Sequence, residues 1–144
     1  MHLADLIGPE AVIASLKVKT KKQLLQELSA RAARLTGLQE RYVFDTLLQR
    51  ERLGSTGLGQ GIAIPHGKFA GLKRITGICA RLGEPVNFEA VDGQPVDIVF
   101  LLDTSASMGT YDVLPSRIWL AQSLVRRMAQ QLRGNRMALV QAEG

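Results

Sequence analysis

The sequence is poor in residues that build disulfide frameworks, thiolate metal sites and stacking platforms for nucleic acids. It holds a single cysteine, Cys79, among 144 residues, so neither a disulfide framework nor a cysteine-ligated zinc site is supported. Aromatic residues make up only 5% of the chain, and no nucleic-acid-binding motif is present. The net charge of +5 is therefore better explained by a solvated basic face, or by docking of an acidic protein, than by nucleic acid.

Long apolar runs are also missing. No stretch approaches the about 20 apolar residues that span a bilayer, and the N-terminal residues MHLADLIGPE lack the basic start and apolar core of a signal peptide. A hydrophobic content of 46% with 22% charged residues is ordinary for a globular chain. We therefore expect one compact, cytoplasmic domain without a membrane span.

One segment is unusually rich in glycine. Residues 54–68 read GSTGLGQGIAIPHGK and place five glycines and one histidine around a short apolar strand at 62–64. Glycine adopts positive φ and lets the backbone approach a ligand, so successive N–H groups can converge on a phosphate. Pro65 cannot continue a strand ladder, which predicts that His66 emerges at the strand end and faces the glycines. The simpler interpretation is a glycine-rich turn beside a buried histidine.

The chemistry favoured by this segment is phosphoryl transfer. Imidazole is a good nucleophile near neutral pH, and a phosphorylated ring nitrogen passes its phosphoryl group on. Phosphate binding is predicted for Gly54, Ser55, Thr56, Gly57, Gly59, Gly61 and Gly67. For the two hydroxyl side chains, shaping the turn is the alternative role.

The same string, with its flank at 49–53, resembles the active-site segment of type-2 EIIA domains of the phosphotransferase system, of the fructose and nitrogen-regulatory type. It is most similar to the nitrogen-regulatory branch, and the resemblance covers about residues 3–101. This implies that His66 accepts phosphate and that Arg50 lies beside it, where its fixed charge stabilises a loosely bound phosphoryl group. A solvated helix arginine is the alternative for Arg50, and Arg52 and Lys68 are interpreted as surface charges.

The periodicities predict an α/β fold, and the resemblance to EIIA domains implies a mixed sheet that is flanked by helices. Thr20 and Gln23 form a capping-box pattern ahead of an amphipathic helix that Gly37 ends. A second helix is predicted at about 39–52, and Asp92-Gly93 is a turn signal. Strands are predicted at 62–64, 75–82, 86–88 and 96–102.

The resemblance to EIIA domains breaks after Phe100. Those domains continue with a helix that opens on a second histidine, whereas no histidine follows His66 here. The residues VDIVFLLDTSASMG instead resemble the opening of a von Willebrand factor A-type domain, and this similarity covers about 96–144. Its DxSxS motif implies an incomplete Mg²⁺ or Mn²⁺ site at Asp103, Ser105 and Ser107.

The chain is therefore interpreted as a fusion or chimera. Residues 1–102 form an EIIA-like phosphoacceptor region, and residues 103–144 form a von Willebrand A-like β-loop-α-β segment that completes one compact domain. In that arrangement the DxSxS loop takes the place of the second histidine, close to His66.

The resemblance implies a phosphoryl carrier of the nitrogen-regulatory phosphotransferase system. A histidine phosphocarrier protein would phosphorylate His66, the phosphorylation state would regulate protein targets, and no cofactor is required. The alternatives are a sugar-specific EIIA component of the fructose or mannitol type, a divalent-metal-dependent interaction module, and an inactive chimera. The sequence leaves the downstream target and the oligomeric state open.

Overall fold

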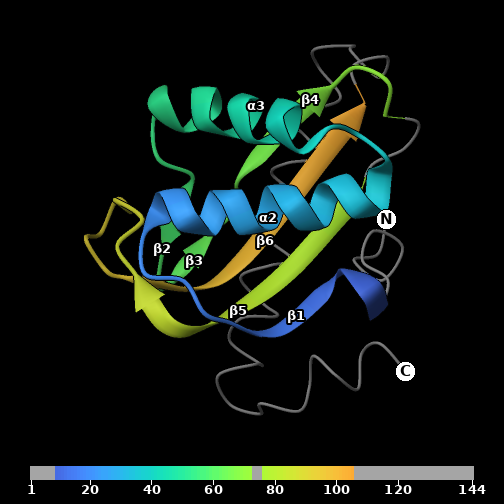
Figure 1. Cartoon of the computed structure of the whole chain (residues 1–144). Coiled ribbons are helices and arrows are strands. Elements are labelled where there is room, and N and C mark those ends of the chain that lie inside the picture. The colour runs from blue at the N-terminus through green and yellow to red at the C-terminus, as the bar shows by residue number, and fades with distance from the viewer. Residues whose placement is uncertain (1–8, 73–75, 106–144) are drawn as a thin grey trace.

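Two antiparallel helices lie side by side across one face of a mixed β-sheet (Figure 1). The structure, a computed structural model, describes residues 9–72 and 76–105. The helices are α2 (Lys21–Thr36) and α3 (Glu40–Arg52), preceded by a short 3₁₀ turn, η1 (Pro9–Ala11). The strands are β1 (Val12–Leu16), β2 (Gly57–Gly59), β3 (Ile62–Ala63), β4 (His66–Phe69), β5 (Thr76–Val86) and β6 (Val96–Ser105).

The sheet is centred on β6, which contacts three other strands. The order is β1-β5-β6-β3-β2, with β4 also paired to β6 beyond the end of β3. The β5–β6 and β2–β3 pairs are antiparallel, and the pairs of β1 with β5 and of β3 and β4 with β6 are parallel. The predicted α/β class, a mixed sheet with flanking helices, is confirmed.

Local signals set both ends of α2. Thr20 Oγ1 accepts a hydrogen bond from the Gln23 N–H at 3.1 Å, and the Gln23 side chain accepts one from the Lys19 N–H at 2.9 Å. At the other end, Gly37 has a φ of 78° and its N–H donates to Ala33 O. This left-handed conformation is open to glycine at little cost, so the helix ends where the sequence predicts.

Removing the cap hydroxyl tests this assignment. Thr20→Ala is expected to lower the free energy of unfolding by about 1 kcal/mol, because the N–H of Gln23 loses its acceptor. Thr20→Ser keeps the oxygen and is expected to stay close to wild type. Urea unfolding of the three proteins gives the comparison, and equal stability of the alanine variant and wild type would contradict the capping role.

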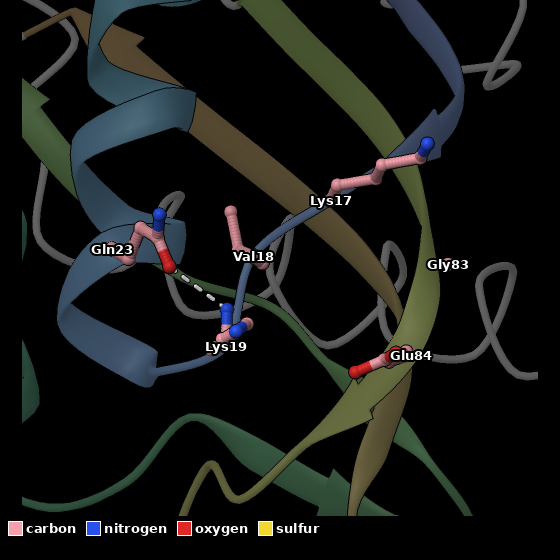
Figure 2. A pocket seen from close by; sticks show the side chains of 6 residues that line it. All are labelled: Lys17, Val18, Lys19, Gln23, Gly83 and Glu84. Atoms are coloured by element: carbon pink, nitrogen blue, oxygen red, sulfur yellow. Dashed lines mark hydrogen bonds between the residues drawn. The ribbon is translucent and has the colours of Figure 1, made fainter.

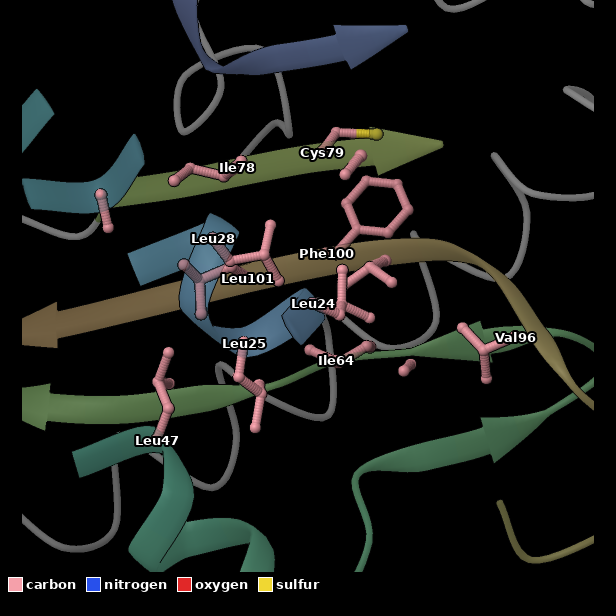
Figure 3. Close-up of a cluster of buried hydrophobic side chains, with 14 of the residues drawn as sticks. Leu24, Leu25, Leu28, Leu47, Ile64, Ile78, Cys79, Val96, Phe100 and Leu101 are labelled. Atoms are coloured by element: carbon pink, nitrogen blue, oxygen red, sulfur yellow. The ribbon is translucent and has the colours of Figure 1, made fainter. Parts of the chain in front are cut away.

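A large part of the core lies between the two helices and the sheet. Figure 3 shows Leu24, Leu25 and Leu28 of α2 in one buried cluster with Ile78 and Leu101 of the central strands. These side chains are at most 1% exposed, and burying each large apolar side chain contributes roughly 1.5–3 kcal/mol. As predicted, the sole cysteine is buried in β5.

The strands differ from the sequence predictions in several places, and β1 and β2 were not predicted. The two strands predicted at 75–82 and 86–88 form one strand, β5, and a shift in register between Arg81 and Val86 accommodates the intervening residues. β4 was not predicted either, and it begins at His66. β6 continues to Ser105 because β4 supplies backbone partners for residues 102–105. Asp103 is therefore a strand residue, and the prediction that a loop begins there is wrong.

The predicted loop-α-β continuation after β6 lies outside the described residues, so the division of the chain at residue 102 stays a prediction. Within 9–72 and 76–105, neither helix is long and apolar enough to cross a membrane.

Candidate functional site

His66 and Arg50 meet where β4 begins beneath the end of α3. Arg50 Nε donates a hydrogen bond to His66 Nε2 at 3.2 Å. Arg50 Nη1 donates to Gly54 O at 2.9 Å, so the guanidinium bridges the imidazole and the glycine-rich loop. The structure thus brings together the two residues that the sequence singles out. Their roles in phosphoryl transfer stay a prediction.

The hydrogen bonds of His66 define its tautomer. Ile64 O lies 3.0 Å from Nδ1, and because a carbonyl oxygen only accepts, Nδ1 carries the proton. Arg50 Nε only donates, so Nε2 is unprotonated and accepts this hydrogen bond with its lone pair. The partly buried ring is therefore a neutral imidazole that points its unprotonated nitrogen at a cation.

The surroundings lower the pKa of His66 below its usual value of 6.5, chiefly because burial penalises the charged ring. The hydrogen bond to Ile64 O opposes this shift, the charge of Arg50 adds to it, and the charge of Glu51 opposes it. The net effect keeps Nε2 unprotonated at neutral pH, which is the state that a nucleophile requires.

The five glycines of this segment are required for two different structural reasons, a positive φ or a lack of space for a side chain. Gly54, Gly59 and Gly61 have positive φ, as the sequence predicts. Gly57 and Gly67 do not, and they provide space instead: a Cβ at Gly57 would lie 2.8 Å from Ala90 Cβ, and one at Gly67 would lie 3.0 Å from the Phe69 ring. The expectation of positive φ is wrong for these two, because close packing is what requires glycine there.

The two hydroxyl side chains of the loop are engaged within the protein. Ser55 Oγ donates to Phe88 O at 2.8 Å, and the Thr56 hydroxyl donates to the carboxylate of Glu51. Both contacts fit the turn-shaping alternative, whereas their binding of phosphate stays a prediction. Arg52 and Lys68 are exposed, in agreement with their interpretation as surface charges.

Glu51 is the residue of this site that sequence reasoning missed. It is buried although it is charged, and its carboxylate holds the loop that follows α3. The available signal was its spacing, because Val43, Leu47 and Glu51 lie four residues apart and share the inward face of the helix.

Asp103 lies in β6 opposite Gly67 of β4, one residue along the ladder from His66. It is fully buried, and both carboxyl oxygens lack a hydrogen-bond partner among the residues described. Burial raises the pKa of Asp103 to about 7. No group of three His, Cys, Asp or Glu side chains that could hold a metal occurs within 9–72 and 76–105. The cation site stays a prediction, since the Ser105 side chain and Ser107 lie outside the described part.

A cavity of about 400 Å³ lies where the chain enters α2, next to β5 (Figure 2). Lys17, Lys19, Gln23 and Glu84 contribute to its lining. None of the residues predicted to act in phosphoryl transfer lines it, so this cavity is separate from the histidine site.

Residues 5–110 match the family described as phosphoenolpyruvate-dependent sugar phosphotransferase system, EIIA 2. The chain belongs to this family. The match includes the whole glycine-rich segment with His66, so the sequence resemblance is confirmed.

The relatives of this EIIA domain include several nitrogen regulatory proteins. That of Bradyrhizobium diazoefficiens is 51% identical over 139 residues, which cover 96% of this chain and 90% of the relative. That of Klebsiella oxytoca is 40% identical over 103 residues, and the match spans 71% of this chain but only 64% of the relative. The crystal structure of nitrogen regulatory protein IIA-Ntr from Neisseria meningitidis has a TM-score of 0.79 at 36% identity, covering 90% of this chain and 88% of that one.

The comparisons do not confirm a chimera. Residues 98–144 match the von Willebrand factor type A domain family, but this short match overlaps the EIIA match over 98–110. The alignment with the Bradyrhizobium protein covers 96% of the chain and therefore includes most of the segment after residue 102. One nitrogen regulatory protein thus resembles both parts of this sequence.

Proposed function

We propose that this EIIA domain is a phosphoryl carrier of a nitrogen-regulatory phosphotransferase system and that His66 Nε2 is the acceptor atom. The observation that carries the proposal is the contact of Arg50 Nε with an unprotonated Nε2, on a ring whose other nitrogen donates to Ile64 O. The nitrogen regulatory protein that aligns with 96% of the chain favours this role over that of a sugar-specific EIIA component.

The transfer itself requires one nucleophile and one source of positive charge. The lone pair of Nε2 attacks the phosphorus of a phosphohistidine on the donor, and the Nε2–P bond forms as the donor's N–P bond breaks. The donor imidazole leaves with the electron pair of that bond. Arg50 Nε–H donates to Nε2 before transfer and to a phosphoryl oxygen after it. The guanidinium can make this exchange because it already lies beside the atom that gains the phosphoryl group.

The carbonyl of Ile64 stabilises the positive charge that the transfer creates on the ring. Once Nε2 is bonded to phosphorus and Nδ1 keeps its proton, the ring is formally cationic. The hydrogen bond from Nδ1 to Ile64 O stabilises that proton. The resulting N–P bond stays labile, so the same group can be passed on or returned.

The partners follow from this chemistry. The donor is a histidine phosphocarrier protein in the cytoplasm, and the phosphorylation state of His66 alters binding to regulatory protein targets. The reaction needs no organic cofactor or metal, and nucleic acid is not a partner.

Phosphorylation is measured by the intact mass of the full chain after incubation with phosphoenolpyruvate, the general phosphotransferase enzyme and the phosphocarrier protein. We expect one acid-labile phosphate on wild type and none on His66→Ala, in which His2 is the only remaining histidine. An unmodified wild type in the presence of a charged donor would contradict the proposal. Phosphate retained by His66→Ala would refute the assignment of the acceptor.

A further inference from the structure

Glu51 lies directly after Arg50 in the last turn of α3, on the side that faces the protein. Its side chain is only 4% exposed. Oε1 accepts a hydrogen bond from the Thr56 N–H at 3.1 Å and pairs with Lys21 Nζ at 3.0 Å, and Oε2 accepts one from the Thr56 hydroxyl. A buried carboxylate is costly unless it is paired in this way, so the contacts with Thr56 are strong constraints on the loop.

Thr56 passes this constraint on to the histidine. Thr56 O accepts a hydrogen bond from the Ile64 N–H at 3.0 Å. Ile64 O in turn is the acceptor of His66 Nδ1–H at 3.0 Å. Three hydrogen bonds, joined through the backbones of Thr56 and Ile64, therefore connect the Glu51 carboxylate to the imidazole of His66.

The same carboxylate joins the loop to two further elements. Lys21, at the start of α2, lies 4.4 Å from the centre of the Phe88 ring while it pairs with Glu51. Phe88 O accepts the hydroxyl hydrogen bond of Ser55. The loop between α3 and β2 is thus held at Ser55 and Thr56 through a network that has Glu51 at its centre.

We infer that Glu51 is a positioning residue for phosphoryl transfer: it fixes Thr56, and through Thr56 it fixes the Ile64 carbonyl that keeps His66 in the Nδ1–H form. This inference rests on the proposed function for the reaction, but its structural part concerns the unphosphorylated protein. The Glu51 charge also raises the pKa of His66 and so opposes the effect of Arg50.

The test compares the full-length wild type with four variants. Glu51→Gln removes the charge and one acceptor at nearly constant shape. Thr56→Val removes the hydroxyl donor, and Thr56→Ser retains it. Glu40→Gln makes the same charge change at an exposed position in the first turn of the same helix. Two quantities are measured: the ¹⁵N ring signals of His66 without phosphate at several pH values, and the rate of phosphorylation by the charged phosphocarrier protein.

In Glu51→Gln and Thr56→Val we expect a smaller fraction of the Nδ1–H tautomer and phosphorylation slowed by about 10- to 100-fold, because the acceptor ring loses its fixed orientation. Glu51→Gln should also lower the pKa of His66. Glu40→Gln should match wild type in the ring signals and in the phosphorylation rate, and Thr56→Ser, which keeps the hydroxyl, should restore most of what Thr56→Val loses. If Glu51→Gln does not fold, the Thr56 pair decides.

Unchanged His66 ring signals in Glu51→Gln or Thr56→Val would overturn the inference, even if phosphorylation slows. A slower rate with unchanged signals in Thr56→Val would instead assign its hydroxyl to direct contact with the phosphoryl group. If wild type accepts no phosphate, the proposed function fails, whereas the ring signals still decide whether Glu51 positions His66.

Discussion

Replacement of Arg50 by methionine is expected to slow phosphorylation of His66 on the order of 100-fold or more, since one preorganised donor to a transition-state oxygen is removed. Arg50 Nε lies 3.2 Å from the acceptor nitrogen, so the guanidinium is in place before the donor arrives. Methionine keeps the length and apolar part of the side chain. The loss therefore reports on the charge and the donors of Arg50.

The pH dependence separates two effects of Arg50. Its charge lowers the pKa of His66, so Arg50→Met should raise that pKa and increase the protonated fraction below neutral pH. A protonated ring has no lone pair on Nε2, and the defect should therefore grow from pH 8 to pH 6. At pH 8 the ring is neutral in both proteins, and the rate ratio there measures stabilisation of the transferring group alone.

Arg52→Met is the matched control, because Arg52 is exposed in the same last turn of α3. It should phosphorylate at the wild-type rate. Arg50→Lys keeps a positive charge without the planar fork that reaches both Nε2 and Gly54 O, and it should recover only part of the rate. A wild-type rate for Arg50→Met at both pH values would show that Arg50 has no part in transfer.

Asp103→Asn is expected to become more stable relative to wild type as the pH rises from 5 to 8. Burial raises the pKa of Asp103 from 3.8 to about 7, and within the described residues its oxygens have no hydrogen-bond partner. The folded state therefore binds this proton more tightly than the unfolded state. The contribution of Asp103 to stability is therefore expected to fall by roughly 4 kcal/mol as the pH rises from about 4 to about 7.

Asparagine does not ionise in this range. The free energy of unfolding of Asp103→Asn minus that of wild type should therefore increase with pH by the amount that wild type loses through ionisation of Asp103. Urea unfolding at pH 5, 6, 7 and 8 gives that difference. Asp45→Asn is the control, because its carboxylate is exposed on α3. A difference between Asp103→Asn and wild type that does not change with pH would mean that Asp103 is not a buried, proton-binding carboxyl.

The parts of this fold that follow from the sequence depend on near neighbours. The ends of α2 are visible in Thr20, Gln23 and Gly37 because each cap involves residues within four positions. The glycine-rich segment is equally local, and it points to His66 through a short run of residues that matches a known family.

The parts that sequence reasoning missed depend on distant partners. The residues HGKF of β4 lack a strand-like alternation of apolar and polar side chains, and they form a strand because Leu102–Ser105 supply the paired backbone. The same pairing draws Asp103 out of the expected loop and into the sheet. Glu51 was overlooked because its burial depends on Lys21 and Thr56, which the sequence alone does not place beside it.

The most direct test that His66 Nε2 accepts the phosphoryl group is the ¹⁵N spectrum of the His66 ring in the full chain before and after transfer from the charged phosphocarrier protein. We expect a neutral ring with its proton on Nδ1 in the free protein, and phosphorus bonded to Nε2 with the proton still on Nδ1 after transfer. Phosphorus on Nδ1, or an unphosphorylated His66 beside a charged donor, would contradict this expectation.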